Sequence, residues 1–282
     1  MEVIITALGP DNVGLADPII HHVTGRGARI AEIQMYDHDE EHIFAMLCRI
    51  DIEADEFEPL TDAMRQIGQH TSLAIRVWSS ENREKRPRIA VCCTYVEHTP
   101  RAVLEAIQSD LISAETAVLI SNRDKLGTLA DEFNIPFRMI GNDRGVADDD
   151  AMTQILDEFD VDYVVLARYM RILSPNFVWR YPNRIINIHP SLLPAFPGAL
   201  AYAQAYERGT KIVGVTSHYV TENLDQGPII FQDSFKVDPN DTLEKIKSKG
   251  QKLEADTLLK ATKMHLENKL EVRWRKVHIK SK

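Results

Sequence analysis

Residues 184–196 read RIINIHPSLLPAF, and this stretch decides how the larger part of the chain folds. It begins as an apolar run typical of a buried strand and ends in two prolines, which stiffen the exit and remove backbone donors. Two polar side chains, Asn187 and His189, interrupt the run. Because residues two apart on a strand point to the same side, the pattern predicts an amide and an imidazole that face one space. A packed core would favour neither group.

The sequence upstream of this stretch alternates strand-like and helix-like segments. From residue 88 the chain runs RIAVCCT, PRAVLEAIQSDL, TAVLIS, DKLGTLADEFNI, PFRMI, AMTQILDEF and DYVVLARY. Near-continuous apolar strands separated by helices predict an α/β fold with a Rossmann-like, mainly parallel, doubly wound sheet. Ligands of such sheets gather at the carboxyl ends of the strands. Asn187 and His189 fall at one of these ends.

The last part of the chain predicts one helix and one edge strand. The helix is expected to begin at Asp241, with Glu244 in position for a capping box. Its apolar positions recur at helical spacing, at Leu243, Ile246, Gly250 and Leu253. Val272 and Trp274 then alternate with polar residues, which predicts the edge strand.

The first 78 residues predict a separate small domain. Their patterns indicate, in order, a strand, a helix, two strands, a helix and a strand, which is a βαββαβ sandwich. In the second strand Ala31, Ile33 and Met35 alternate with polar residues, as expected of a half-buried strand.

A short charged segment separates the two parts of the chain. Residues 79–88, SSENREKRPR, contain no apolar residue except proline, so they predict a linker. The predicted organisation is therefore a domain at 1–78, a linker at 79–88 and a second domain at 89–282.

The start of the first domain resembles that of an ACT domain, a ligand-sensing module attached to many metabolic enzymes. The resemblance lies in LGPDNVGLADPIIHHVTGRGARI, residues 8–30. It implies an amino-acid effector bound at a paired interface, and it does not identify the amino acid. The loop at Asp11, Asn12 and Gly14 leads into a helix N-terminus, which suits a carboxylate. The other interpretation of this loop is a capped helix start without a ligand.

A third polar group stands downstream in IVGVTSHYVTENLDQGPII, residues 212–230. This segment predicts a strand, a polar turn that holds Asp225, and a second strand. An amide, an imidazole and a carboxylate together suit acyl chemistry, because an amide N–H stabilises an oxyanion and the other two groups move protons. Each residue also has a structural interpretation: His189 in a core, Asp225 in turn chemistry, Asn187 at a strand end. The spacing alone does not connect Asp225 to the other two.

The connection comes from a resemblance to the folate-dependent formyltransferases, which use 10-formyltetrahydrofolate as formyl donor. It lies in residues 184–230 and in VVLARYMRILSPNFV, residues 164–178, and extends from residue 88 to about residue 279. It implies that Asn187, His189 and Asp225 are the catalytic residues. The loop that holds the pterin, the opposite wall of the pocket and a histidine near the trio are implied at Met170, Arg171, Ile172, Leu173, His218, Val220, Glu222 and Leu224. The MRIL segment also has an interpretation as core packing.

An ACT domain joined to this fold resembles the formyltetrahydrofolate deformylases. That resemblance implies hydrolysis of 10-formyltetrahydrofolate to tetrahydrofolate and formate, which supplies formate or balances the one-carbon pool for purine synthesis. It implies no cofactor beyond the folate substrate, no metal, and a homo-oligomer, as a dimer or a tetramer. Two departures stand out: Pro190 follows His189 where deformylases carry a second histidine, and Leu-Ala-Tyr follows Gly198-Ala199 in place of Arg-Pro-Tyr.

Two alternatives to a hydrolase stay open. The first is a formyltransferase that acts on an unidentified amine. Transferases with a phosphorylated acceptor carry a Gly-rich loop after the first strand, whereas CCTYVEHTPRAVLEAI, residues 92–107, contains no glycine. The second is a regulatory protein with an inactive catalytic domain, which the intact Asn187, His189 and Asp225 argue against.

Composition limits the partners and the location that we expect. The net charge of -9 and the pI near 5.6 argue against a broad nucleic-acid surface. Three cysteines without a CxxC spacing predict neither a disulfide framework nor a zinc site and favour the cytoplasm. No stretch approaches 18 uninterrupted apolar residues, and the N-terminus does not resemble a signal peptide, so no membrane association is expected.

Overall fold

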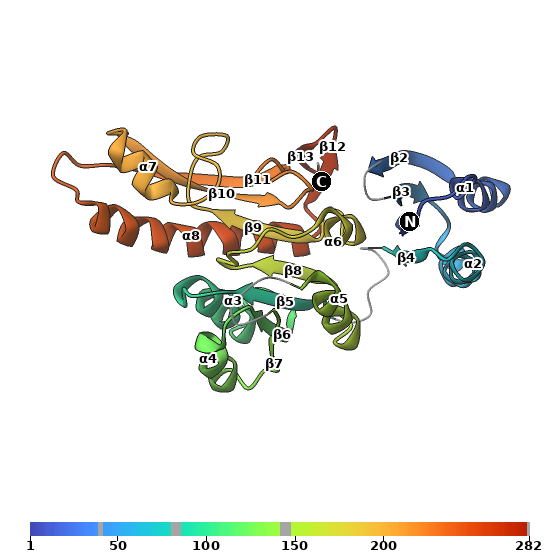
Figure 1. Cartoon of the computed structure of the whole chain (residues 1–282), viewed down its shortest axis with the longest axis horizontal. Helices are drawn as coiled ribbons and strands as arrows, with labels where there is room; N and C mark the ends of the chain where they lie inside the picture. The colour runs from blue at the N-terminus through green and yellow to red at the C-terminus, as the bar shows by residue number, and fades with distance from the viewer. Residues whose placement is uncertain (39–41, 80–85, 142–147, 281–282) are drawn as a thin grey trace. The chain divides into compact units, whose positions relative to one another are not determined.

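The computed structural model describes residues 1–38, 42–79, 86–141 and 148–280, which form two compact units (Figure 1). Most of the linker predicted at 79–88 lies outside the described residues. At its edges, the hydroxyl of the buried Ser79 donates to the carbonyl of Glu2 in the first unit, and Arg88 begins the first strand of the second unit.

The first unit has the predicted βαββαβ order. Its sheet is antiparallel where β1 meets its neighbours, and its strand order is β2-β3-β1-β4. The apolar positions of both helices, among them Ile19, Val23, Leu60 and Met64, are buried in one core. The elements are β1 (Glu2–Pro10), α1 (Ala16–Gly25), β2 (Arg29–His38), β3 (Ile43–Asp51), the 3₁₀ turn η1 (Ala54–Glu56), α2 (Phe57–Thr71) and β4 (Ala74–Trp78).

The second strand of this unit is correctly predicted, but its apolar face is less buried than expected. Ile33 and Met35 pair with Cys48 and Met46, so they lie on the core side of the sheet. Both side chains are nevertheless exposed. The reason is that β2 is an edge strand, with a neighbour on one side only.

The second unit is built on a seven-stranded sheet of order β11-β10-β9-β8-β5-β6-β7. The strands from β9 to β7 in this order are parallel, and β10 and β11 add two antiparallel strands at one edge. The predicted mainly parallel α/β fold is confirmed. The strands are β5 (Arg88–Cys93), β6 (Glu115–Ser121), β7 (Phe137–Met139), β8 (Tyr163–Leu166), β9 (Ile185–His189), β10 (Ile212–Tyr219) and β11 (Ile229–Lys236).

Helices cover this sheet and connect its strands. The long helix α8 packs along β9, β10 and β11 and against α3 (Figure 1). The apolar strand residues and the inner faces of these helices form the main core of the unit. The helical elements are α3 (His98–Gln108), the 3₁₀ turn η2 (Asp124–Leu126), α4 (Gly127–Glu132), α5 (Asp149–Glu158), α7 (Ala201–Glu207) and α8 (Leu243–Leu266).

The C-terminal predictions need two corrections. Helix α8 is capped by Thr242, whose hydroxyl accepts from Lys245 N at 3.3 Å, and Asp241 pairs with lysines of the first turns instead. The predicted edge strand is a hairpin of β12 (Leu270–Arg273) and β13 (Lys276–Ile279). Trp274 lies in its turn with φ 53° and is 92% exposed, because the chain reverses there.

Helix α6 (Pro175–Arg180) groups with the first unit, although the sequence placed it within residues 89–282. Phe177 and Tyr181 are buried, and the Arg76 guanidinium lies 4.9 Å from the centroid of the Tyr181 ring.

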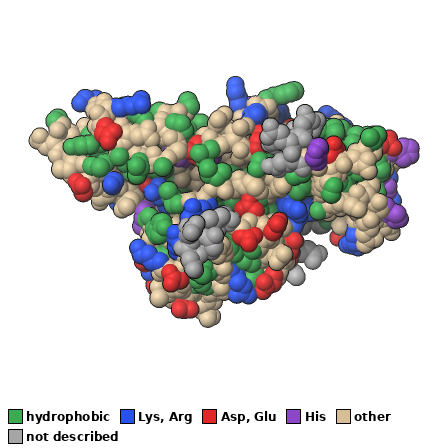
Figure 2. Space-filling model, viewed as in Figure 1, with side chains coloured by type: hydrophobic (Ala, Val, Ile, Leu, Met, Phe, Trp, Pro, Cys, Tyr) green, Lys and Arg blue, Asp and Glu red, His purple; other side chains and the backbone are tan. Residues whose placement is uncertain are grey.

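On the face shown in Figure 2, Lys and Arg side chains are interspersed with Asp and Glu. Among the described helices, none is both long and apolar enough to cross a membrane.

Candidate active site

A cavity of about 510 Å³ opens in the second unit where β8 and β9 end. All the residues that the sequence analysis assigned to catalysis or to substrate binding line this cavity. They are Asn187, His189 and Asp225, together with Met170, Arg171, Ile172, Leu173, His218, Val220, Glu222 and Leu224. The topology therefore brings together side chains from three segments that are far apart in the sequence.

Strand β9 positions the first two polar groups. Asn187 and His189 both reach the cavity, whereas the side chain of Ile188 packs in the hydrophobic core. The antiparallel neighbour β10 places His218 opposite Asn187 and Thr216 opposite His189. A register shift between Ser217 and His218 in the β10–β11 pairing re-aims the strand at this point.

His218 fixes the amide of Asn187. Its Nδ1 lies 2.8 Å from the carbonyl oxygen of Tyr219, so this nitrogen carries the hydrogen. Burial lowers the pKa of His218 below its ordinary value of 6.5 and keeps the ring neutral. The lone pair of Nε2 is then free to accept from Asn187 Nδ2 at 3.2 Å. One N–H of the amide is anchored in this way, and the amide nitrogen retains a second N–H.

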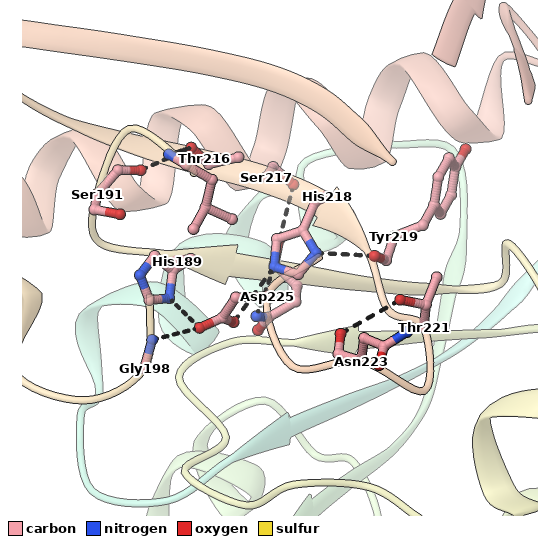
Figure 3. A network of polar contacts seen from close by, with 12 residues as sticks. His189, Ser191, Gly198, Thr216, Ser217, His218, Tyr219, Thr221, Asn223 and Asp225 are labelled. Atoms are coloured by element: carbon pink, nitrogen blue, oxygen red, sulfur yellow. Dashed lines mark hydrogen bonds and ion pairs between the residues drawn. The ribbon is translucent and has the colours of Figure 1, made fainter. Parts of the chain in front are cut away.

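The turn between β10 and β11 brings the carboxylate to the same place (Figure 3). Asp225 adopts φ 56°, a left-handed conformation that Asp tolerates. Its Oδ2 accepts from the backbone N–H of Gly198 at 2.7 Å and lies 3.3 Å from His189 Nδ1. Its Oδ1 lies 3.8 Å from His218 Nε2, beyond hydrogen-bond distance. Oδ1 is thus the carboxylate oxygen that is open to a further partner.

A glycine closes this turn. A Cβ on Gly227 would overlap the carbonyl oxygen of Tyr219, so only glycine lets the chain pass there. This close approach of Gly227 to Tyr219 fixes the turn. Asp225, two residues earlier, lies next to His189 and His218. Sequence reasoning placed Asp225 in a turn but had no means of showing where the turn would point.

His189 is held at both ring nitrogens. Nδ1 faces Asp225, and Nε2 lies 2.9 Å from the carbonyl oxygen of Phe196, so Nε2 carries a hydrogen in this contact. The sequence predicted only that the imidazole faces the same space as the Asn187 amide. In the structure the segment after Pro194 folds back over the ring, and the Phe196 carbonyl oxygen lies at Nε2.

Four exposed apolar side chains line the cavity, which suits a flat aromatic ligand: Met170, Ile172, Leu200 and Leu224. Leu173 is buried, whereas Ile172 is not, so the core-packing interpretation of the MRIL segment holds for Leu173 only. Leu200 was not predicted, because an isolated leucine in a loop carries no signal.

Sequence reasoning missed three further polar side chains that line the cavity. They are Arg168, Tyr202 and Glu254. Tyr202 and Glu254 lie in helices without a motif, and Arg168 is a single charge after an apolar strand. Only the packing of α7 and α8 brings the three together. In the part of the chain that the structure describes, no group of three His, Cys, Asp or Glu side chains is suited to a metal ion.

The residues predicted to bind an effector lie in the first unit just before α1. Asp11, Asn12 and Gly14 are exposed, Asn12 Oδ1 accepts from Val13 N at 2.8 Å, and Gly14 has φ 80°. No side chain caps α1 at Leu15. A cavity of about 290 Å³ in this unit is lined by other residues, among them Arg26, at the opposite end of α1.

Two family models match the chain and together cover most of it. Residues 2–78 match the model described as ACT domain, and residues 87–262 match the model described as Formyl transferase. A curated relative from Bacillus subtilis (strain 168), named formyltetrahydrofolate deformylase, is 37% identical over 267 residues. The match covers 93% of this chain and 88% of the relative.

The solved structures that resemble this chain include deformylases and glycinamide ribonucleotide transformylases. A formyltetrahydrofolate deformylase from Pseudomonas syringae pv. tomato has a TM-score of 0.68 and 29% identity to this chain. The match covers 99% of this chain and 94% of the deformylase chain. Glycinamide ribonucleotide transformylase 1 from Symbiobacterium toebii has a TM-score of 0.66 and 34% identity. The match covers 72% of this chain and 99% of the transformylase chain.

Proposed function

The chain belongs to the formyltetrahydrofolate deformylases, within the formyl transferase family, and from this premise we propose how it hydrolyses 10-formyltetrahydrofolate to tetrahydrofolate and formate. The observation that carries the proposal is the convergence of Asn187, His189 and Asp225 in one cavity. In the reaction, a water oxygen bonds to the formyl carbon, the bond from that carbon to the folate nitrogen breaks, and the nitrogen gains a proton.

Asn187 stabilises the negative charge on the formyl oxygen. One of its amide N–H groups is anchored on His218 Nε2, so the amide nitrogen is fixed before the substrate arrives. The remaining N–H donates to the oxyanion of the tetrahedral intermediate. A donor held in place in a cavity with apolar walls is worth more than the same donor in water, because it does not reorganise during the reaction.

Asp225 takes the proton from the attacking water. Its Oδ2 is committed to Gly198 N, so the water is expected at Oδ1. The backbone N–H that binds Oδ2 holds the carboxylate in one orientation. A base fixed in this way suits general-base catalysis.

His189 carries the proton to the departing folate nitrogen. Its Nδ1 faces Asp225, so a proton that reaches the carboxylate has a route to the ring. Its Nε2 donates to the Phe196 carbonyl in the structure. We therefore expect substrate binding to replace this contact, so that Nε2–H turns from the carbonyl oxygen towards the folate nitrogen.

The exposed apolar side chains that line the cavity support the binding of the folate ring system. Met170, Ile172 and Leu224 would lie against the flat faces of the ring, and backbone groups of residues 170–173 would bind its polar edge. We propose that no cofactor beyond the folate takes part. Water, the amide, the imidazole and the carboxylate suffice for the proton transfers above.

A second candidate is transfer of the formyl group to an amine. The similarity to the transformylase structure over 72% of this chain favours it. Two observations favour hydrolysis. The Bacillus subtilis deformylase matches across both units, and the segment from β5 into α3, residues 92–107, has no glycine for a backbone phosphate cradle.

The physiological setting is a further part of the proposal. Formate release would balance the one-carbon pool for purine synthesis, and the ACT domain would bind an amino acid at Asp11, Asn12 and Gly14. The exposed apolar Ile33 and Met35 on an edge strand support a homo-oligomer. Three free buried cysteines support a reducing cytoplasm.

The experiment that tests the function is formate release from 10-formyltetrahydrofolate by the purified full chain without an added amine. We expect steady release by the wild type and loss in His189→Ala. Folate binding without formate release would reject hydrolysis and favour the transferase. Formate release that persists in His189→Ala would reject the role of the imidazole.

A further inference from the structure

Helix α6 stands in the sequence between two parts of the proposed active site, but it packs in the first unit. Residues 170–173 line the cavity just before it, and strand β9, which carries Asn187 and His189, follows it. Residues 175–182, which we call the α6 segment, nevertheless group with the first unit, where α6 contacts β1 and β3. The chain thus leaves the second unit between two parts of the catalytic cavity and then returns to it.

Aromatic side chains hold the α6 segment in the first unit. Phe177 and Tyr181 are 1% and 0% exposed, and their ring centroids lie 5.2 Å apart. The guanidinium of Arg76, on β4, lies 4.9 Å from the centroid of the Tyr181 ring, which is the geometry of a cation–π contact. Strands β3 and β4 flank β1 in the sheet, so three neighbouring strands fix this helix.

Both ends of the α6 segment are stiff. It begins at Pro175 and ends at Pro182, and the ring of a proline fixes φ near about −65°. Pro175 is the first residue of the helix, a position that favours proline. Asn183 follows with φ 56°, a left-handed conformation that Asn tolerates. A displacement of α6 is therefore passed on to the flanking residues, because little flexible backbone is present to absorb it.

The residues that flank the α6 segment are fixed in the second unit. Before it, the backbone N–H of Ser174 donates to Asp149 Oδ2 at 2.5 Å. After it, Arg184 Nη2 lies 3.5 Å from Asp162 Oδ1. Ser174 directly follows the cavity-lining residues 170–173, and Arg184 directly precedes β9. The position of α6 thus sets the direction in which the chain leaves the first of these and enters the second.

We propose that Arg76 and Tyr181 are positioning residues of the active site, through which the first unit sets the placement of residues 170–173 and of Asn187 and His189. The inference rests on the proposed function, because it concerns the groups to which that proposal assigns folate binding and catalysis. Neither Arg76 nor Tyr181 lines the cavity. Arg76 holds the Tyr181 ring, and the ring holds the helix that connects the folate-binding residues to the catalytic strand.

The same path connects the proposed effector loop to the cavity. Asp11, Asn12 and Gly14 follow directly on β1, and β1 contacts α6. Arg76 lies opposite Thr6 of β1 in the sheet. A ligand that moves the end of β1 would therefore act on α6 and, through the chain, on the cavity. Coupling of this kind is reciprocal, so folate binding would also change the first unit.

The first test removes the cation from the Tyr181 ring and measures the kinetics of formate release. Arg76→Ala is expected to lower kcat/KM for 10-formyltetrahydrofolate about fivefold, chiefly through KM, because the folate-binding residues lose their fixed position. The fivefold figure converts to about 1 kcal/mol. Arg76→Lys keeps a cation at this place and should restore most of kcat/KM. Arg65→Ala, which removes an exposed arginine of α2, should leave kcat/KM unchanged.

A further variant separates positioning from stability. Val23→Ala truncates a buried side chain of α1 and should lower the Tm, because the cavity that it leaves costs stability. Measured well below the Tm, kcat/KM of this variant should equal that of the wild type. Wild-type kcat/KM in Arg76→Ala, or an equal loss in Val23→Ala, would overturn the proposal.

The second test follows the wild type itself. Tetrahydrofolate, the product, is added to the full chain under anaerobic conditions, and hydrogen exchange is measured in β1 and β3. We expect the amides of these strands to exchange about threefold more slowly with the product bound, and we expect no such change in Arg76→Ala. Unchanged exchange in the wild type, with binding confirmed by fluorescence, would reject the coupling. Absence of formate release is a different result, because it removes the proposed hydrolysis while the exchange experiment still decides the coupling.

Discussion

The amide nitrogen of Asn187 lies 3.2 Å from Nε2 of His218, on the directly opposite position of the neighbouring strand. His218 is itself fixed by its bond to the Tyr219 carbonyl, so only Nε2 accepts. The oxyanion donor that we propose, Asn187, is therefore oriented by a second residue that is buried on the next strand. Positioning through β10 explains how an amide with rotatable bonds remains aimed at one point.

Replacing His218 by Phe should lower kcat for formate release about tenfold. The ring volume remains, but the acceptor for the Asn187 amide is lost. One hydrogen bond is worth up to about 1.5 kcal/mol, which corresponds to roughly tenfold in rate. Steady-state kinetics with 10-formyltetrahydrofolate measure this effect. His218→Gln is the matched variant, because its Oε1 can accept from the amide, and it should recover part of kcat. If both variants retain wild-type kcat, His218 does not position Asn187.

Replacing Asp225 by Asn should lower kcat by roughly 10²-fold or more, because an amide is no base. The variant keeps the size of the side chain and an oxygen that can accept from Gly198 N, so binding of the folate should change little. Rapid-quench measurement of formate, with folate binding followed by fluorescence, separates the two effects. Asp131→Asn on the exposed face of α4 serves as control. Near-normal formate release by Asp225→Asn would rule out its role as the base.

How much of this site the sequence predicts depends on the range of each interaction. The pair Asn187 and His189 follows from strand alternation, which is local. The contact between Asp225 and His189 required the family resemblance, since 36 residues and a turn of unusual φ separate them. The contact of His189 Nε2 with Phe196 O was missed, because the fold-back of a proline-rich loop leaves no periodic signal.

The same limit applies to the fold. The periodic strands and helices are predicted well, and the βαββαβ order is confirmed. Trp274 was misassigned because alternation continues into the tip of a hairpin, where the turn conformation decides. Glu254 was missed because a lone carboxylate on a helix is normally solvated, and its burial depends on α3 and α7 packing against α8.

The stability of the second unit should fall as the pH drops below about 6.5. Burial lowers the pKa of His218 in the folded state, so the unfolded chain takes up a proton near pH 6.5 while the folded chain does not. The contribution of His218 to the free energy of unfolding is fully present above pH 6.5. It is lost progressively as the pH falls towards the pKa of His218 in the folded state. Urea unfolding between pH 5 and pH 8 measures it. His218→Gln should flatten this dependence, whereas His21→Gln, at an exposed position of the first unit, should not.

Replacing Gly250 by Ala should destabilise the protein, although alanine is the better helix former. The gain in helix propensity is about 1 kcal/mol. Against it, the new Cβ overlaps the Tyr202 hydroxyl, and overpacking of this kind costs typically 1–3 kcal/mol. The steric cost wins, and Tyr202, whose hydroxyl donates to Glu254 at 2.7 Å, must move away from it. The Tm of thermal unfolding and kcat for formate release should both decrease. Gly25→Ala at the end of α1, where a Cβ meets nothing within 4 Å, is the matched control and should be neutral or stabilising. A stabilised, fully active Gly250→Ala would show that Tyr202 is free to shift and that its bond to Glu254 is dispensable.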